Sequence, residues 1–182
     1  MVKNRFVTGA KHIPLSQGKF AIVDEDDYWK LSKFKWSLDG DGYAIRGRTG
    51  STKGISYTRF IRVQGENIKL RNIKMHQEII SAPDGLVCDH INRNKLDNRK
   101  SNLRIVTIGQ NCMNRIKMHN CAVAYKGVSK EGNKYVSRIQ VKDLRLRKRG
   151  FINAIDAAKW YDEMALKYHG EFACTNKMLG LL

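Results

Sequence analysis

The stretch LVCDHINRNKLDNRKSNLRIVTIGQNCMN, residues 86–114, contains the pattern that best defines the fold of this chain. The apolar run Leu86 to His90 predicts a short strand, and a polar loop rich in Asn, Asp, Lys and Arg follows it. The alternating, β-branched residues of Leu103 to Val106 predict a second strand. Thr107 then occupies the N-cap position before a helix expected over Gln110 to Met118. We therefore expect the order strand, loop, strand, helix.

Four polar side chains of this stretch form a candidate site for phosphodiester hydrolysis. The imidazole of His90 is suited to act as general base, because an unperturbed imidazole is largely neutral at cellular pH and can accept a proton from water. Asp89 and Asn111 are suited to bind a hard cation, since one carboxylate and one carboxamide leave room for water and phosphate oxygens. We predict one divalent cation per active site, Mg²⁺ with Mn²⁺ as the alternative. Asn102 is placed to orient the His90 imidazole by a hydrogen bond.

These residues and their spacing resemble the HNH motif of the ββα-metal (His-Me finger) endonucleases. The resemblance is closer still to phage and intron-encoded HNH homing endonucleases. It is carried by Asp89, His90, Asn92, Asn94, Asp97, Asn98, Asn102, Leu103, Arg104, Thr107, Asn111 and Asn114, with His76 in support. The resemblance implies the same roles for the four site residues. Asn94, Asp97 and Asn98 are expected to shape the loop rather than to bind metal.

The charge of the chain indicates a polyanionic partner. Lys and Arg number 34 against 17 Asp and Glu, which gives a formal net charge of +17 at pH 7. Such an excess fits DNA, RNA or an anionic membrane. The chain has no apolar run of about 18 residues and no secretory signal pattern, so we expect no membrane partner and a cytoplasmic location, the host cytoplasm if the protein is phage-encoded.

The cysteines do not predict a metal centre. No two of Cys88, Cys112, Cys121 and Cys174 have the two-to-four-residue gap of structural zinc knuckles. We therefore expect reduced thiols in a cytosolic protein and no structural zinc.

The first 73 residues predict a β-rich segment. Short apolar runs between turn residues predict strands over Phe20 to Val23, Tyr43 to Arg46, Ile55 to Ile61 and Ile68 to Ile73. The acidic residues from Asp24 to Asp27 are interpreted as the start of a helix ending at Leu31 rather than as a metal site. Met75 to Ile80 fits a short helix or a strand. This segment also resembles the N-terminal part of the HNH homing endonucleases, and its basic loop, Arg46 to Arg62, is expected to add DNA contacts.

The last third of the chain predicts a three-stranded sheet that carries one helix. Strands are expected over Tyr125 to Ser129, Tyr135 to Val141 and Leu144 to Ile152. Asn153 is the expected N-cap of a helix that runs to His169, with Gly170 ending it in the left-handed conformation. The expected apolar face of this helix consists of Ala154, Ala157, Tyr161, Met164 and Tyr168. Residues 120–124 are the expected linker to the preceding unit.

Basic residues on this sheet predict a DNA-binding surface. Nine Lys or Arg residues and two acidic residues lie between Lys126 and Arg149. Alternation along a strand places Arg138 and Gln140 on one face, and likewise Arg145, Arg147 and Arg149. Arginine can bind guanine, and glutamine adenine, in a bidentate manner. The predicted DNA-binding residues are Lys126, Lys130, Lys134, Arg138, Gln140, Arg145, Arg147 and Arg149.

This region resembles the ethylene-response-factor (Apetala-type) DNA-binding domain of plants. The likeness is carried by Tyr125, Gly127, Val128, Gly150, Phe151, Ala157, Ala158, Tyr161, Asp162, Ala165, Leu166, Gly170, Phe172, Ala173 and Asn176. That family places its three-stranded sheet in the major groove. The first strand here departs from the family's arginine-rich pattern, with Lys126, Ser129 and Lys130, so the preferred base sequence does not follow from the resemblance.

Together these observations predict an α+β chain of three parts: a β-rich segment at 1–73, an HNH motif at 74–119 and an ethylene-response-factor-like domain at 125–176. The predicted function is a site-specific, metal-dependent DNA endonuclease acting on double-stranded DNA as a homing enzyme. The alternative is a non-cleaving, sequence-specific DNA-binding regulator that retains a degenerate HNH scaffold. No obligate protein partner is evident, and the sequence leaves open whether the protein forms a homodimer.

Overall fold

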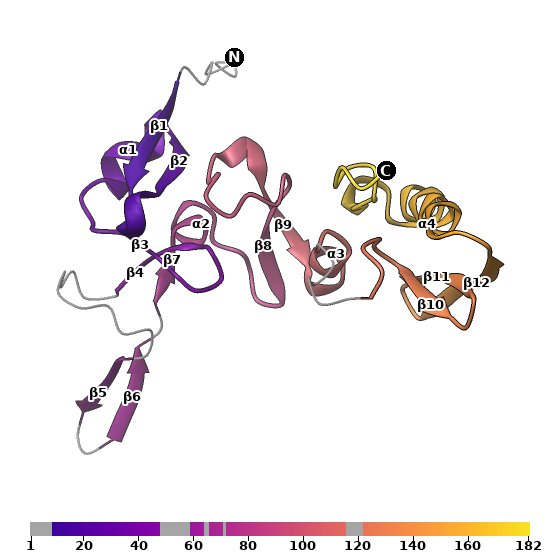
Figure 1. Cartoon of the computed structure of the whole chain (residues 1–182). Coiled ribbons are helices and arrows are strands. Elements are labelled where there is room, and N and C mark those ends of the chain that lie inside the picture. Colours follow the sequence, from indigo (N-terminus) through magenta and orange to yellow (C-terminus); the bar gives the residue numbers. More distant parts are fainter. Residues whose placement is uncertain (1–8, 48–58, 64–65, 71, 116–121) are drawn as a thin grey trace, which may run out of the picture. The chain divides into compact units, whose positions relative to one another are not determined.

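The computed structural model describes residues 9–47, 59–63, 66–70, 72–115 and 122–182 (Figure 1). The fold is mixed α+β with several small sheets and few helices, as predicted. The chain forms two compact units, Met1–Val106 and Thr107–Leu182. This boundary falls inside the segment 74–119 that the sequence groups as one motif. The division into three parts at the predicted boundaries stays a prediction.

The first unit begins with an antiparallel pair of strands, β1 (Ala10–Pro14) and β2 (Phe20–Asp24), joined through the short 3-10 helix η1 (Ser16–Gly18). The helix α1 (Glu25–Leu31) follows β2 directly. Its first turn contains three acidic residues, which confirms that this acidic cluster marks a helix start. Strand β1 was not predicted from the sequence.

A second group of elements in this unit leads to the candidate site. Strands β3 (Ser37–Leu38), β4 (Ala44–Arg46) and β7 (Ile73–Lys74) form a three-stranded sheet, and β5 (Arg59–Val63) pairs with β6 (Glu66–Leu70). The helix α2 (Met75–Ile79) starts directly after β7, so the helical alternative for this segment is confirmed. Most of the basic loop and the start of the strand expected at Ile55 lie outside the described residues.

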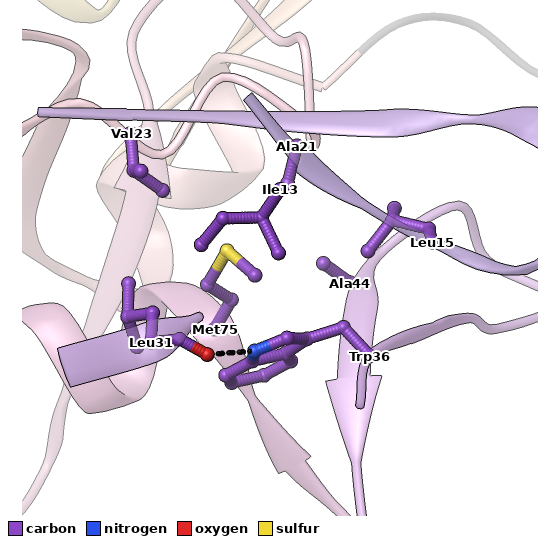
Figure 2. Close-up of a cluster of buried hydrophobic side chains, with 8 residues drawn as sticks. All are labelled: Ile13, Leu15, Ala21, Val23, Leu31, Trp36, Ala44 and Met75. Carbon is purple, nitrogen blue, oxygen red and sulfur yellow. Dashed lines mark hydrogen bonds between the residues drawn. The ribbon is translucent and has the colours of Figure 1, made fainter. Parts of the chain in front are cut away.

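One hydrophobic core joins β1, β2, α1, β4 and α2 (Figure 2). Its buried members are Ile13, Leu15, Ala21, Val23, Leu31, Trp36, Ala44 and Met75. The indole of Trp36 donates a hydrogen bond of 2.8 Å to the carbonyl oxygen of Leu31, so its polar atom is satisfied inside the core (Figure 2). Met75 is completely buried and opens helix α2. The core therefore fixes the position of the next residue, His76.

A partly buried ion pair fixes the other end of α2. Arg46 on β4 donates to both carboxylate oxygens of Glu78, at 2.8 and 3.0 Å, and both side chains are 12% exposed. The Arg46 guanidinium also lies 4.0 Å from the ring centroid of Phe34. Bidentate and stacked contacts of this kind require arginine rather than lysine.

The second unit contains α3 (Ile108–Met113) and the predicted three-stranded antiparallel sheet with one helix. The strands are β10 (Val128–Glu131), β11 (Lys134–Val141) and β12 (Leu144–Phe151), in the order β10-β11-β12. Helix α4 (Ala154–His169) packs on this sheet through two clusters of apolar side chains. Asn153 caps α4 as predicted, because its side chain accepts a hydrogen bond from the Asp156 amide at 2.8 Å.

The buried face of α4 differs from the predicted one. It consists of Ala157, Ala158, Tyr161, Asp162, Ala165 and His169, whereas Tyr168 is 42% exposed. Asp162 turns inward because its carboxylate accepts hydrogen bonds from the backbone amides of Asn176 and Lys177, at 2.7 and 2.9 Å. The face is thus set by the C-terminal segment as well as by apolar burial. Gly170 ends α4 with φ 54° and ψ −124°, a positive φ outside the left-handed helical region that was predicted.

A glycine allows the segment before β10 to pack on α4. Gly127 has φ +75°, and a Cβ atom there would lie 1.9 Å from Cδ2 of Tyr161. Asn176, which is completely buried, accepts a hydrogen bond of 2.6 Å from the amide of the preceding residue, Lys126. The sheet, α4 and the C-terminal segment are therefore locked together at this point.

Candidate active site

The site begins at the end of strand β8 (Leu86–His90), which pairs with β9 (Leu103–Thr107). Asp89 and His90 are its last two residues, and both are buried. Neighbouring side chains on a strand point to opposite faces, so the end of the strand is where two adjacent residues can serve one site. Past His90, the Ile91 amide donates to the carbonyl oxygen of Asn102 at 2.8 Å, and a turn follows.

The loop between β8 and β9 is held by its own polar side chains. Asn92 and Asn94 each accept a hydrogen bond from an amide two residues further on, at 2.8 and 3.1 Å. The Asp97 carboxylate accepts hydrogen bonds from Nε and Nη2 of Arg99, each at 2.7 Å, and these hydrogen bonds lower the pKa of the carboxyl. Asn94 and Asp97 thus shape the loop, as the sequence predicted.

The N-terminal strands anchor this loop from outside. Ile22 on β2 donates its amide to the carbonyl of Leu96 and accepts the amide of Asn98, each at 2.7 Å. Asp24, at the end of β2, accepts the amide of Lys100, also at 2.7 Å. Strand β2 therefore fixes the conformation of the loop that follows His90.

The His90 imidazole meets the amide of Asn98. Its Nε2 lies 3.3 Å from Oδ1 of Asn98, while Nδ2 of Asn98 donates to the Leu96 carbonyl at 3.2 Å. Because Oδ1 can only accept, Nε2 carries the proton, and Nδ1 is the nitrogen with the basic lone pair. Burial lowers the pKa of His90 below its ordinary value, so the ring is neutral at pH 7.

Asn102 has a different set of partners from the one expected. Its Oδ1 accepts the amide of Asn92 at 2.9 Å, and its Nδ2 donates to the carbonyl of Asp97 at 2.7 Å. The amide of Asn102 therefore holds the two ends of the loop, and the amide against the imidazole belongs to Asn98. Both are buried asparagines of one loop, so only the folded loop distinguishes them.

Asp89 is paired with an arginine from the neighbouring strand. Nε and Nη2 of Arg104 lie 3.1 and 3.0 Å from the same carboxylate oxygen, Oδ2. This ion pair gives the buried carboxylate a partner of opposite charge. The oxygen donor fits a hard cation, and sharing the carboxylate with Arg104 leaves a site of low negative charge.

Asn111 belongs to the second unit. It lies in α3, which Thr107 and Gln110 begin with a capping box: Oγ1 of Thr107 accepts the Gln110 amide at 3.2 Å, and Oε1 of Gln110 accepts the Thr107 amide at 2.9 Å. The N-cap predicted at Thr107 is confirmed. Asn111 is half-buried. Its role as a ligand together with Asp89 stays a prediction. Within the described ranges, no three His, Cys, Asp or Glu side chains are grouped as a metal site.

An aromatic cluster borders the imidazole. The ring of His76 lies edge-on to that of His90, with centroids 5.0 Å apart, and Tyr43 lies 5.2 Å from His76 and 6.0 Å from His90. Burial, with smaller contributions from His90 and Lys74, lowers the pKa of His76 to about 3. A spacing pattern does not reveal Tyr43, because it lies far from His90 in the sequence.

The predicted DNA-binding side chains gather on one face of the C-terminal sheet. Arg138 lies directly opposite Arg147, and Gln140 opposite Arg145, so these side chains share a face. The surface formed by Lys134, Arg138, Gln140, Arg145, Arg147 and Arg149 is called the basic face below. Placing two arginines directly opposite each other costs stability through like-charge repulsion. DNA binding by this face stays a prediction.

Glu131, at the end of β10, is an acidic member of this surface that the sequence did not single out. Its carboxylate lies 2.7 Å from Nη2 of Arg147 and 3.5 Å from Nε of Arg149. Arg138 instead donates to the hydroxyl of Ser129 at 2.7 Å. The arginines of β11 and β12 are therefore ordered by partners on β10.

The two lysines near the start of the sheet differ in their environment. Lys126 directs its ammonium group to the carbonyl oxygens of Met113 and Arg115, at 2.8 and 2.6 Å, at the C-terminal end of α3. This contact caps the helix and ties it to the sheet. Lys130 is exposed on β10. DNA binding by either lysine stays a prediction.

Comparison with known proteins gives two matches. Residues 81–113 match the family described as HNH endonuclease. A protein of Acanthamoeba polyphaga mimivirus, named an uncharacterized HNH endonuclease, is 29% identical over 163 residues, which cover 89% of this chain and 77% of that protein. No solved structure matches the chain at a significant level. The predicted resemblance to HNH endonucleases is thus confirmed for the segment that contains all four site residues. In the described part of the chain, no helix is long and apolar enough to cross a membrane.

Proposed function

We propose that this protein is a site-specific, metal-dependent DNA endonuclease of the homing type. The observation that carries the proposal is the His90 imidazole, which is buried and neutral and has its proton-bearing Nε2 directed at Asn98. A general base must be unprotonated and fixed in direction before substrate arrives, and this imidazole meets both requirements. The similarity to HNH endonucleases over residues 81–113 supports the same function.

In the proposed reaction, Nδ1 of His90 removes a proton from a water molecule as its oxygen attacks the phosphorus of a phosphodiester. A new P–O bond forms and the bond to the leaving sugar oxygen breaks. The leaving oxygen takes a proton from a solvent water, and the proton on the imidazole returns to solvent. Asn98 keeps Nε2 protonated, which directs the lone pair of Nδ1 at the water. Arg104 holds the Asp89 carboxylate in place through two hydrogen bonds to Oδ2.

A divalent cation, Mg²⁺ or Mn²⁺, would be held by Asp89 and Asn111. When bound, it would supply Lewis-acid stabilisation of the phosphate and of the leaving oxygen. Because Arg104 already shares the Asp89 carboxylate, the protein donors alone should bind the ion weakly. We infer that cation binding is strengthened by the phosphate oxygens of the DNA.

The basic face is proposed to select the DNA sequence, in the manner of the ethylene-response-factor domain that it resembles. Arginines fixed by Glu131 and Ser129 lose little conformational freedom when they meet a base edge. This division of labour predicts that Arg147→Met lowers the preference for a cognate site while cleavage of other DNA continues. Equal loss of preference in Lys33→Met, an exposed lysine of the first unit, would contradict it.

The test of the nuclease proposal is plasmid cleavage in Mg²⁺, in Mn²⁺ and in excess chelator. The intact protein should nick or linearise the plasmid only with metal, and His90→Ala should lower the rate by at least about 10²-fold. His12→Ala removes an exposed histidine from β1 and is the matched control. If the intact protein binds DNA and never cleaves it, the non-cleaving regulator is the better account.

A further inference from the structure

We propose that Lys74, Lys95 and Tyr43 form a phosphate-binding site beside the His90 imidazole, and that its ligand is a backbone phosphate of a nucleic-acid strand. The assignment of that strand to a DNA substrate rests on the proposed nuclease function. The phosphate site itself rests on the arrangement of the three side chains, which come from separate parts of the first unit.

The two lysines converge on one aromatic ring. Nζ of Lys74, the last residue of β7, lies 3.9 Å from the ring centroid of Tyr43, and Nζ of Lys95, from the loop between β8 and β9, lies 4.6 Å from it. An ammonium group over an aromatic face is attracted by the negative potential of the ring. Both ammonium groups therefore lie against the ring of Tyr43.

These groups border the candidate active site. The Tyr43 ring lies 6.0 Å from that of His90 and 5.2 Å from that of His76. Lys95 is one of the charges that lower the pKa of His90, and Lys74 is one of those that lower the pKa of His76. Both ammonium groups are thus close enough to act on the imidazoles through their charge.

Neither ammonium group is neutralised within the described residues. Lys95 donates to the backbone carbonyl of Asp41 at 2.7 Å, and no ion pair joins Lys74 or Lys95 to a described carboxylate. Two cations held on one ring without a counter-ion repel each other. A phosphate bound beside them would lower that cost, and lysine is a common phosphate-binding residue.

A cavity of about 410 Å³ opens beside Tyr43 and Lys74, whereas Lys95 is not part of its lining. Its lining includes the rings of Tyr43 and His76, the lysine Lys74 and the hydroxyl-bearing Ser81. This volume lies within the usual range for small-ligand sites, so it has room for a phosphate with a flanking sugar. The lining also includes the apolar Ala82, Leu86 and Val87. The cation, the hydroxyl and the aromatic groups could contact a phosphate and its sugar, and the apolar side chains could pack against the sugar.

The site would add to the active site a function that His90 does not provide. The phosphate of a bound strand carries negative charge, and the charge moves onto its oxygens as the water attacks. Preorganised ammonium groups beside the imidazole would stabilise that charge and hold the strand at a fixed distance from Nδ1. Lys74 and Lys95 would thus bind the reacting strand, and Tyr43 would position them.

The first test measures phosphate binding without any cleavage. Inorganic phosphate and a dinucleotide with one phosphorothioate are titrated into the full-length protein while the ring proton resonances of Tyr43 and His76 are followed by NMR. Both ligands should shift these resonances, and the dinucleotide should bind more tightly because the cavity has room for its sugars. In the Lys74→Met/Lys95→Met double variant, affinity should fall by at least tenfold, and in Lys33→Met it should not change. Unchanged binding in the double variant would overturn the site, and tighter binding of inorganic phosphate would overturn its assignment to a strand.

The second test measures the effect on cleavage. At saturating DNA, Lys95→Met should reduce the single-turnover rate by about 10²-fold, as expected for loss of one preorganised group, while DNA affinity falls by less than about threefold. Lys95→Arg should restore most of the rate, and Tyr43→Phe, which keeps the ring, should resemble the intact protein. Cleavage by the double lysine variant at the normal rate would overturn the proposal. If the intact protein does not cleave DNA but its phosphate binding depends on both lysines, the nuclease function falls and the phosphate site stands.

Discussion

Replacing His76 should remove much of the acid sensitivity of the first unit. His76 is buried against His90 and Tyr43, and its pKa falls from 6.5 to about 3 in the folded protein. Between these two values the unfolded chain binds a proton that the folded chain does not. The resulting stability is complete above about pH 6.5 and is lost as the pH falls toward 3. At roughly 1.4 kcal/mol per pH unit, lowering the pH from 7 to 5 should cost about 2 kcal/mol through His76 alone.

The assay is urea unfolding at pH 7 and pH 5, followed by the fluorescence of Trp36, which is buried in the core of the same unit. Trp29 and Trp160 are replaced by Phe so that Trp36 alone reports. The loss of unfolding free energy between the two pH values should be about 2 kcal/mol smaller in His76→Phe than in the parent protein. His90 titrates in both proteins, so the difference isolates His76. Equal losses in the two proteins would refute the neutral, buried state of His76.

Three further predictions concern other parts of the molecule. Gly127→Ala should lower the thermal stability of the second unit by more than about 1 kcal/mol, since a Cβ there meets Tyr161 at 1.9 Å; unchanged calorimetry would contradict this packing. Cys88 should be alkylated slowly at pH 8 and faster as the pH rises toward 11, because burial raises the pKa of its thiol to about 11. Mass spectrometry measures the alkylation, and rapid modification at pH 8 would contradict the burial of Cys88. Glu131→Gln should strengthen binding of random-sequence DNA and weaken discrimination, as measured by fluorescence anisotropy; weaker binding to random DNA would contradict its position beside Arg147.

The local pattern around the site could be predicted from the sequence because its signals are local. The run from Leu86 to His90 forms the expected strand, and Thr107 forms the expected cap with Gln110. Alternation along β11 and β12 also placed Arg138 and Arg147 correctly on one face, since the side-chain period of a strand is fixed.

Partners that depend on distant segments could not be predicted in this way. Asn98, rather than Asn102, meets the imidazole because β2 binds the loop through Ile22, more than 60 positions earlier in the chain. The buried face of α4 includes Asp162 because the segment after the helix returns to it. Likewise, the contacts of Tyr43 with His90 and with Lys74 depend on the folded arrangement, in which β4 pairs with β7. Sequence periodicity contains no information about such contacts.

The central claim is that His90 acts as the general base of DNA cleavage, and chemical rescue tests it most directly. His90→Ala removes the imidazole and leaves a space of its size beside Asn98. The rate of plasmid cleavage by this variant in Mg²⁺ should be near zero and should rise with added imidazole, in proportion to its neutral form. Cleavage by His90→Ala at the rate of the intact protein, without added imidazole, would contradict the claim.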